Sequence, residues 1–183
     1  MVGNTKQSAF TLLEVIVSVA IFAVIILAAT QIFQSVISSQ VKNFSETSLQ
    51  DDAKYFLEVF TREARGAQKN TTAAALCDDI IATSSTYVVT HGALYFQNNL
   101  GDCVRYYSKF DADGVNRLVL QRNDDSYYLS SNKIDIDNLS FVVADESNIQ
   151  PLVTMNLTVK SKVNLNLPAL NIQTSINSGW YAN

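Results

Sequence analysis

The first strong pattern in the chain is an apolar stretch near its amino terminus. Between residues 10 and 29 the only polar residues are Thr11, Glu14 and Ser18. A helix rises about 1.5 Å per residue, so this stretch is about 30 Å long as a helix, which matches the hydrocarbon core of a bilayer. The pattern therefore predicts a membrane-spanning helix over residues 10–29, with one carboxylate close to its start.

Helical periodicity continues beyond this stretch. From Ile37 onward, apolar residues recur mostly at steps of three and four, and charged residues occupy the other faces. No Gly or Pro interrupts the chain between Gly3 and Gly66, and Gly66 is expected to stop the helix. We predict one helix from residue 10 to about residue 65, on the order of 85 Å long. Residues 30–68 form its amphipathic half.

The apolar face of the amphipathic half has to be buried against other apolar residues. A coiled-coil partner fits less well than a domain core, because the apolar spacing departs from a strict heptad. We therefore expect this face to lie in the core of a soluble domain. Its large members are Phe44, Phe56, Leu57 and Phe60.

From Thr86 onward the period of the pattern changes to two. Such alternation places one face of each strand in the core and the other in water, as in antiparallel sheets. The clearest run alternates from Val153 and keeps its parity through Leu165 and Leu167 to Pro168. The other predicted strands are 87–90, 93–96, 103–109, 117–121, 127–129 and 139–143, with a last one starting at Leu170.

These patterns predict an α+β fold, in which a long amino-terminal helix packs on a carboxyl-terminal antiparallel β-sheet. Residues 69–183 form the connecting loop and the sheet of the globular domain. Within that part, residues 70–86 are small and polar and are expected to be a surface connection between helix and sheet.

The residues before the apolar stretch allow three interpretations. Residues 1–9 carry Lys6 as their only charge. They fit a secretory signal peptide cut near Ala28 and Ala29, a plain signal anchor, or a short leader whose removal leaves the apolar stretch in the mature protein. The third is favoured, because a conventional signal gains nothing from Glu14 and because the helical pattern continues past residue 29.

Residues 9–15, Ala-Phe-Thr-Leu-Leu-Glu-Val, resemble the processing site of type IV pilins and of the pseudopilins of type II secretion. The resemblance implies that a prepilin peptidase cuts between Ala9 and Phe10 and then N-methylates Phe10. It implies that Glu14, fifth after the cut, acts in filament assembly. The family usually has Gly before the cut. Ala9 is also small, so cleavage is expected.

The physical chemistry of burial agrees with this role for Glu14. A cut after Ala9 creates a cationic amine on Phe10, beside hydrocarbon, and Glu14 of a neighbouring subunit can neutralise it. Each charge loses hydration, so the pair adds little net stability, but a subunit out of register leaves both charges unpaired at a cost of several kcal/mol. The pair is expected to set the register. The alternative is that Glu14 only marks where the helix enters the membrane interface.

The resemblance implies a structural subunit of a type IV pilus or pseudopilus, and a minor subunit in particular. Such a subunit crosses the cytoplasmic membrane once, and an assembly platform then moves it into a periplasmic or extracellular filament of pilin or pseudopilin subunits. Two alternatives stay open. One is an adhesin or DNA-binding subunit at a filament tip, and the other is an exported soluble protein behind a conventional signal peptide.

The two cysteines, Cys77 and Cys103, have about 25 residues between them. Export of this part of the chain places them in an oxidising compartment, where they can form a disulfide. Closing a loop of this size stabilises a protein by about 3 kcal/mol in the chain-entropy model. The alternative is two unpaired buried thiols.

Little else in the sequence indicates chemistry. His91 is the only histidine and stands at a predicted turn, so no nucleophilic triad can be completed. Asp111, Asp113 and Asn116 partly match a calcium loop, but the twelfth position is Arg122 instead of Glu, which favours a turn. We therefore predict no enzyme activity, no catalytic residue, no cofactor and no metal site.

Charge and aromatic residues bear on the partners. The formal net charge of -4 does not support a broad basic surface, so no nucleic-acid partner is predicted. Four tyrosines lie in predicted strands: Tyr106, Tyr107, Tyr127 and Tyr128. Their main expected role is in the sheet itself, and those whose side chains face water are available for adhesion.

Overall fold

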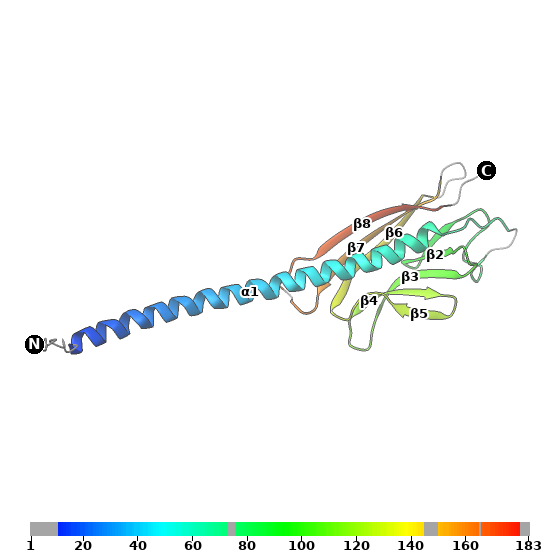
Figure 1. Ribbon diagram of the computed structural model, residues 1–183. Coiled ribbons are helices and arrows are strands. Elements are labelled where there is room, and N and C mark those ends of the chain that lie inside the picture. Colours follow the sequence, from blue (N-terminus) through cyan, green and yellow to red (C-terminus); the bar gives the residue numbers. More distant parts are fainter. Residues whose placement is uncertain (1–10, 73–75, 145–149, 165, 180–183) are drawn as a thin grey trace, which may run out of the picture. The chain divides into compact units, whose positions relative to one another are not determined.

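The computed structural model describes residues 11–72, 76–144, 150–164 and 166–179. The chain divides into two compact units, residues 1–43 and 44–183. A single helix, α1 (Leu12–Arg65), begins in the first unit and ends in the second (Figure 1). It confirms the predicted continuous helix.

Among the described residues, eight strands follow the helix, and all of them lie in the second unit. The first five form one antiparallel sheet in the order β1-β2-β3-β4-β5, and the last three form another in the order β6-β7-β8. Within each sheet, strands that follow one another in sequence pair with each other. The strands are β1 (Tyr87–Thr90), β2 (Ala93–Gln97), β3 (Cys103–Phe110), β4 (Asn116–Arg122), β5 (Asp125–Tyr128), β6 (Ile134–Ala144), β7 (Leu152–Ser161) and β8 (Leu170–Asn177).

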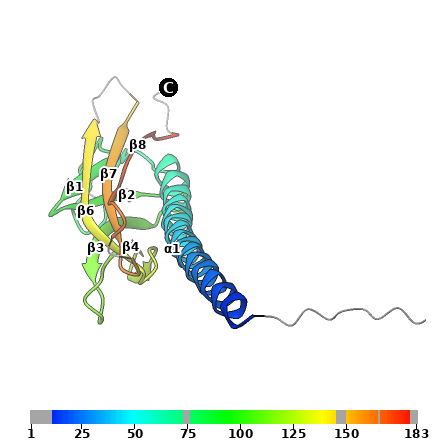
Figure 2. The same cartoon turned by 90° about the vertical axis from the view of Figure 1, so that its left-hand side faces the viewer.

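The fold class is therefore α+β, as predicted, but the strands form two sheets where the sequence predicts one. In the second unit, α1 lies along both sheets (Figure 2). Val59, Phe60 and Ala64 of the helix share a buried cluster with residues of both sheets, among them Phe96 and Met155. A second buried cluster joins the preceding helical turns to β4, β6 and β7, through Leu49, Ala53, Phe56, Leu118, Ile136 and Val159.

Three predictions about this region are wrong in detail. Phe44 does not join the core face of α1, since its side chain is 77% exposed. The strand predicted at 139–143 begins earlier, at Ile134. The alternation predicted to reach Pro168 ends at Ser161, because the Ser161 hydroxyl accepts a hydrogen bond from the Asn164 amide and starts a turn.

The predicted turn between the first two strands is confirmed. His91 and Gly92 connect β1 to β2, with φ angles of 50° and 75°. A two-residue hairpin loop with two positive φ angles matches the right-handed twist of the strands it joins. His91 is exposed, and its Nδ1 atom lies 3.0 Å from the Thr90 hydroxyl.

Distant residues satisfy the carbonyl groups at the end of α1. The Tyr87 hydroxyl donates to the Ala64 carbonyl at 2.7 Å, and the Gly179 amide donates to the Arg65 carbonyl at 2.7 Å. A Cβ on Gly179 would lie 3.0 Å from that carbonyl oxygen, so glycine allows this close approach. Gly66 follows the last helical residue, but its φ is not positive. The helix therefore ends in a tightened last turn, in which the amides of Gly66 and Ala67 donate to the carbonyls three residues earlier, and the tertiary bonds add to it.

We predict that Tyr87→Phe lowers the free energy of unfolding of the second unit by about 0.5–1.5 kcal/mol, because it removes a buried hydrogen bond while the Ala64 carbonyl keeps its bond from the Ala67 amide. The measurement is urea unfolding of the full chain in detergent, followed by near-ultraviolet circular dichroism. Tyr127→Phe is the matched control, since Tyr127 is exposed, and should change stability by less than about 0.5 kcal/mol. Equal stability of the two variants would contradict the role of the Tyr87 hydroxyl.

Candidate functional site

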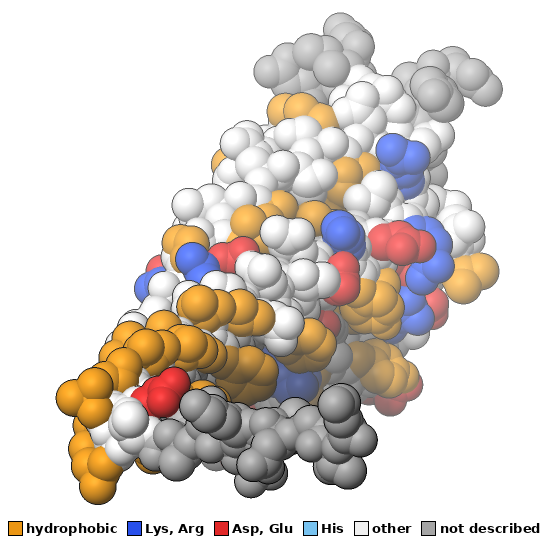
Figure 3. Space-filling model, turned by 60° about the vertical axis from the view of Figure 1, so that its left-hand side comes forward, with side chains coloured by type: hydrophobic (Ala, Val, Ile, Leu, Met, Phe, Trp, Pro, Cys, Tyr) orange, Lys and Arg blue, Asp and Glu red, His pale blue; other side chains and the backbone are white. Residues whose placement is uncertain are grey.

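The described part of the first unit consists of helix with no core of its own. Every residue from 11 to 43 is exposed, and large apolar side chains point outward on all sides of α1. Figure 3 shows such side chains over the amino-terminal part of the helix. A helix that is apolar all round is stable only in a membrane or among other apolar surfaces. Exposed members include Leu12, Val19, Phe22, Ile25, Leu27 and Phe33.

Three hydroxyl side chains of this segment bond to their own helix. The hydroxyls of Ser18, Thr30 and Ser38 donate to the carbonyl four residues earlier, at 2.7, 2.8 and 2.9 Å. Hydrocarbon offers no other partner for a hydroxyl, so these bonds reduce the cost of placing the segment in an apolar environment.

By length and composition, α1 can cross a membrane. A signal sequence near the amino terminus would satisfy the same criterion. The distinction between an anchor and a cleaved signal therefore rests on the residues around the start of the helix.

That start is organised by Thr11 and Glu14. The Glu14 amide donates to the Thr11 hydroxyl at 3.3 Å and to the Thr11 carbonyl at 3.1 Å. Thr11 is thus the N-cap, and Thr-x-x-Glu has the spacing of a capping box. The capping role of Thr11 was not predicted, although the Thr-x-x-Glu spacing is visible in the sequence. A carboxylate in the first turn of a helix is also stabilised by the helix dipole.

Three residues carry the sequence-based prediction of processing and assembly. Ala9 and Phe10 lie outside the described residues. Glu14 lies in the first turn of α1 and is exposed. Cleavage, N-methylation and a registry role for Glu14 remain predictions.

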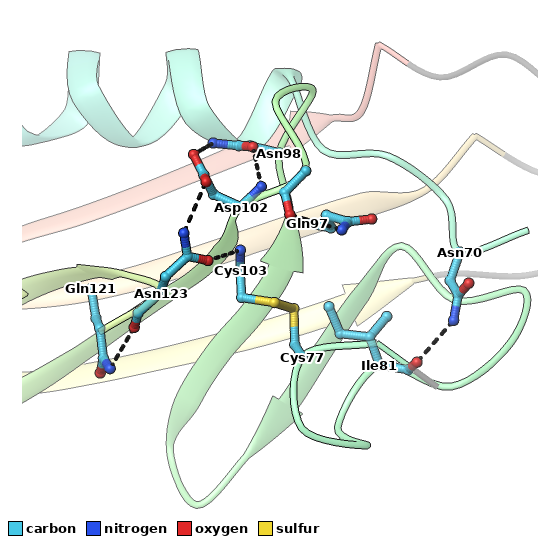
Figure 4. Close-up of a disulfide and its surroundings, with 10 residues drawn as sticks. Asn70, Cys77, Ile81, Gln97, Asn98, Asp102, Cys103, Gln121 and Asn123 are labelled. Atoms are coloured by element: carbon cyan, nitrogen blue, oxygen red, sulfur yellow. Dashed lines mark hydrogen bonds between the residues drawn. A yellow bond between two sulfur atoms is a disulfide. The ribbon is translucent and has the colours of Figure 1, made fainter. Parts of the chain in front are cut away.

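The two cysteines form a disulfide in the second unit, with a Cα–Cα distance of 5.5 Å (Figure 4). The bond fastens the segment between α1 and β1 to the start of β3. Cys77, Asp78 and Asp79 have φ angles of 57°, 58° and 64°, a left-handed turn that costs about 1–2 kcal/mol per residue. The disulfide holds this turn in place.

The segment before β1 is better packed than predicted. It was expected to be a surface connection, but Asn70, Ile81 and Thr86 are buried. The Asn70 side-chain amide donates to the Ile81 carbonyl at 3.0 Å (Figure 4). The buried contacts arise because the disulfide and this hydrogen bond draw the segment against the sheet.

A polar network lies beside the disulfide (Figure 4). The Asn123 side chain accepts from the Cys103 amide at 2.9 Å and donates to Asp102 at 2.9 Å. Asn98 donates to the other Asp102 oxygen at 3.2 Å. The hydrogen bonds from Asn123 and Asn98 lower the pKa of Asp102, so this carboxyl is ionised at neutral pH.

The partial calcium-loop pattern is a turn, as predicted. Asp111 Oδ1 accepts from the amides of Asp113 and Val115, both at 2.9 Å. The other carboxylate oxygen lies 3.7 Å from an Arg117 nitrogen. No group of three or more metal-binding side chains occurs among the residues that the structure describes.

The tyrosines divide between the core and the outer side of the five-stranded sheet. Tyr106 is fully buried, and its ring packs edge-on against Phe60 with centroids 5.1 Å apart. The guanidinium of Arg105 lies 4.3 Å from the ring centroid of Tyr107, and that of Arg117 lies 4.2 Å from Tyr128. Tyr106 is therefore unavailable for adhesion.

Comparisons with known proteins identify one region of the chain. The family model of the prokaryotic N-terminal methylation motif matches residues 4–30. No curated protein and no solved structure matches the chain. The match supports the resemblance drawn from residues 9–15 as an amino-terminal motif, and it covers both the predicted cut and the first part of α1.

We predict that replacing both Cys77 and Cys103 by Ser lowers the free energy of unfolding of the second unit by about 3 kcal/mol, because the unfolded chain regains the freedom of a closed loop. Urea unfolding of the full chain in detergent measures the change. A reducing agent should destabilise the natural chain by a similar amount and leave the double variant unchanged. Unchanged stability of the double variant would contradict this prediction.

Proposed function

We propose that this protein, which carries the amino-terminal motif of type IV pilins and pseudopilins, is a processed minor subunit of a type IV pilus or pseudopilus. One observation carries the proposal. The methylation motif at residues 4–30 coincides with the start of a helix whose apolar surface is exposed on every side. A helix of this kind serves as an anchor in a membrane and as an assembly element among like helices.

Processing prepares the helix for assembly. A prepilin peptidase hydrolyses the peptide bond between Ala9 and Phe10, which releases residues 1–9 and leaves a free amine on Phe10. Methylation of that amine keeps its positive charge. The mature chain then begins one residue before Thr11, the N-cap of α1.

Glu14 supplies the matching negative charge. It is the only acid among the described residues of the first unit. In a neighbouring subunit the charged amine of Phe10 is its expected partner. Removing one member of a buried ion pair leaves the other uncompensated and costs about 3–5 kcal/mol, which is enough to exclude a subunit that is out of register.

Transfer from membrane to filament exchanges one apolar environment for another. Lipid tails and aliphatic side chains are similarly apolar, so the exchange lacks a hydrophobic driving force, and helix packing has to supply specificity. The proposed partners are therefore other pilin or pseudopilin subunits, with an assembly platform that moves the subunit out of the membrane. The proposed role is structural, and the second unit is the part that stays outside the apolar environment.

The assignment as a minor subunit rests on the second unit. Its two antiparallel sheets give it a sizeable strand-rich part, which is the feature that supports this assignment. We place the protein in the cytoplasmic membrane before assembly and in a periplasmic or extracellular filament afterwards.

We predict that the mature protein begins with N-methyl-Phe10, as determined by mass spectrometry of the purified chain. Ala9→Leu should leave the leader uncleaved, because the residue before the cut has to be small. Ala29→Leu is the matched control and should have no effect on processing. A mature chain that starts near Thr30 would instead identify a conventional signal peptide and would contradict the proposed function.

We predict that Glu14→Gln leaves cleavage and methylation intact but reduces incorporation into filaments at least tenfold, since the amine of a neighbouring Phe10 loses its counter-charge. Immunoblots of sheared filaments and of membranes measure the two pools. Glu58→Gln, which removes an exposed acid from the amphipathic half of α1, is the control and should assemble normally. Normal assembly of Glu14→Gln would exclude the registry role.

A further inference from the structure

An apolar hollow lies in the second unit, beside the turns of α1 with which that unit begins. Leu49 of the helix and Ile134 of β6 line it and are only 6% and 2% exposed. Phe44 and Val163 line it as well and are 77% and 65% exposed. The hollow holds about 110 Å³, which approaches the roughly 150 Å³ of apolar cavities that accept benzene. One large apolar side chain is thus the occupant that fits it.

The composition of the hollow favours a helix as the source of that side chain. Ser45 and Ser48 line it on the α1 side and Ser161 on the strand side. Small residues let the backbone of another helix approach closely. Lys133 also lines the hollow, and a lysine stem can cover apolar surface while its amine stays in water.

The apolar surface of α1 leads to this hollow. Ile37, Val41 and Phe44 follow one another at steps of four and three, and they are 45%, 55% and 77% exposed. Residues with this spacing lie on one face of a helix. A partner that covers the exposed apolar face of α1 therefore meets Phe44 at the edge of the hollow.

We propose that the hollow is a docking site for the apolar amino-terminal helix of a neighbouring filament subunit. The proposal rests on the proposed function, because it takes its occupant from the filament. That occupant exposes large apolar side chains in all directions, so a side chain is available to enter between Phe44 and Val163 whatever the rotation of the helix.

The contact joins two different surfaces, the hollow of one subunit and the amino-terminal helix of another. Heterologous contacts of this kind generate open helical arrays unless the rotation between subunits closes a ring. The hollow would thus contribute to the direction of growth of the filament, in addition to the register that Glu14 sets.

The test places the photo-crosslinking amino acid p-benzoylphenylalanine at position 163 of the full chain. After irradiation of assembled filaments, mass spectrometry should identify crosslinks to apolar residues in the amino-terminal helix of a neighbouring subunit. The same amino acid at position 127, on an exposed tyrosine of β5, should give no such crosslink. The position-163 crosslink should disappear in a chain that also carries Glu14→Gln.

A pair of substitutions gives an independent readout. Val163→Asp places a charge in the docking site and should reduce incorporation into filaments at least tenfold, whereas Val163→Ile should assemble normally. Val163 is exposed, so both variants should keep the thermal unfolding midpoint of the natural chain.

The possible negative results contradict different proposals. Filaments that contain the chain but yield no crosslink from position 163 to a neighbouring helix overturn the docking site alone. Crosslinks only to lipid, or only to the strand-rich part of a neighbour, overturn it too. A mature chain that never enters filaments overturns both the docking site and the proposed function.

Discussion

Exposed apolar surface on α1 is the constraint on which the rest of the molecule depends. Large hydrophobic side chains cover the helix from Leu12 to Ile37, and no other described part of the chain covers them. Water cannot accommodate such a surface, so the segment has to be in lipid or in contact with protein at every stage. Membrane insertion and filament assembly are two solutions to the same physical problem. The hydroxyls of Ser18, Thr30 and Ser38 suit either one, because they bond to their own helix.

The second unit answers a different requirement, since under the proposed function it has to stay folded while the helix moves from lipid into a filament. Its core is built on α1 itself, through Phe56 and Phe60, and the end of the helix is fixed by bonds from Tyr87 and Gly179. An ion pair of 2.6 Å between Glu63 and Arg122 ties the last helical turns to β4. These contacts join the last turns of α1 directly to the sheets of the second unit.

Much of this architecture is predictable from the sequence, because the dominant signals are periodic. The helix has no Gly or Pro to interrupt it, and the hairpin at His91 and Gly92 follows from local turn chemistry. The division into two sheets is not predictable in this way. Alternation shows that one face of a strand is buried, but it does not show which strands share a sheet. The extent of β6 was missed because a register irregularity between Ile136 and Asn138 breaks its alternation.

Other misses arise where tertiary contacts override local preference. The left-handed turn at Cys77–Asp79 contains no glycine, so the local sequence does not predict it. Its conformation depends on the disulfide and its surroundings. Phe44 has the helical spacing of a core residue but lies beyond the reach of the core, which periodicity alone cannot reveal. The prediction of processing at Ala9 and Phe10 comes from a local motif, and the capping role of Thr11 is visible in the same few residues.

Glu14 connects the local structure of the helix start with the proposed assembly of subunits. A lone carboxylate in an apolar helix costs several kcal/mol in the middle of a membrane. Glu14 instead occupies the first turn, where the helix dipole and the unpaired amides favour negative charge. The subunit can therefore carry this acid before any partner arrives. In the sequence Glu14 stands four residues after Phe10, where a cut after Ala9 would create a positive charge. The acid in the first turn of one helix is thus the proposed counter-charge for the amine of the next.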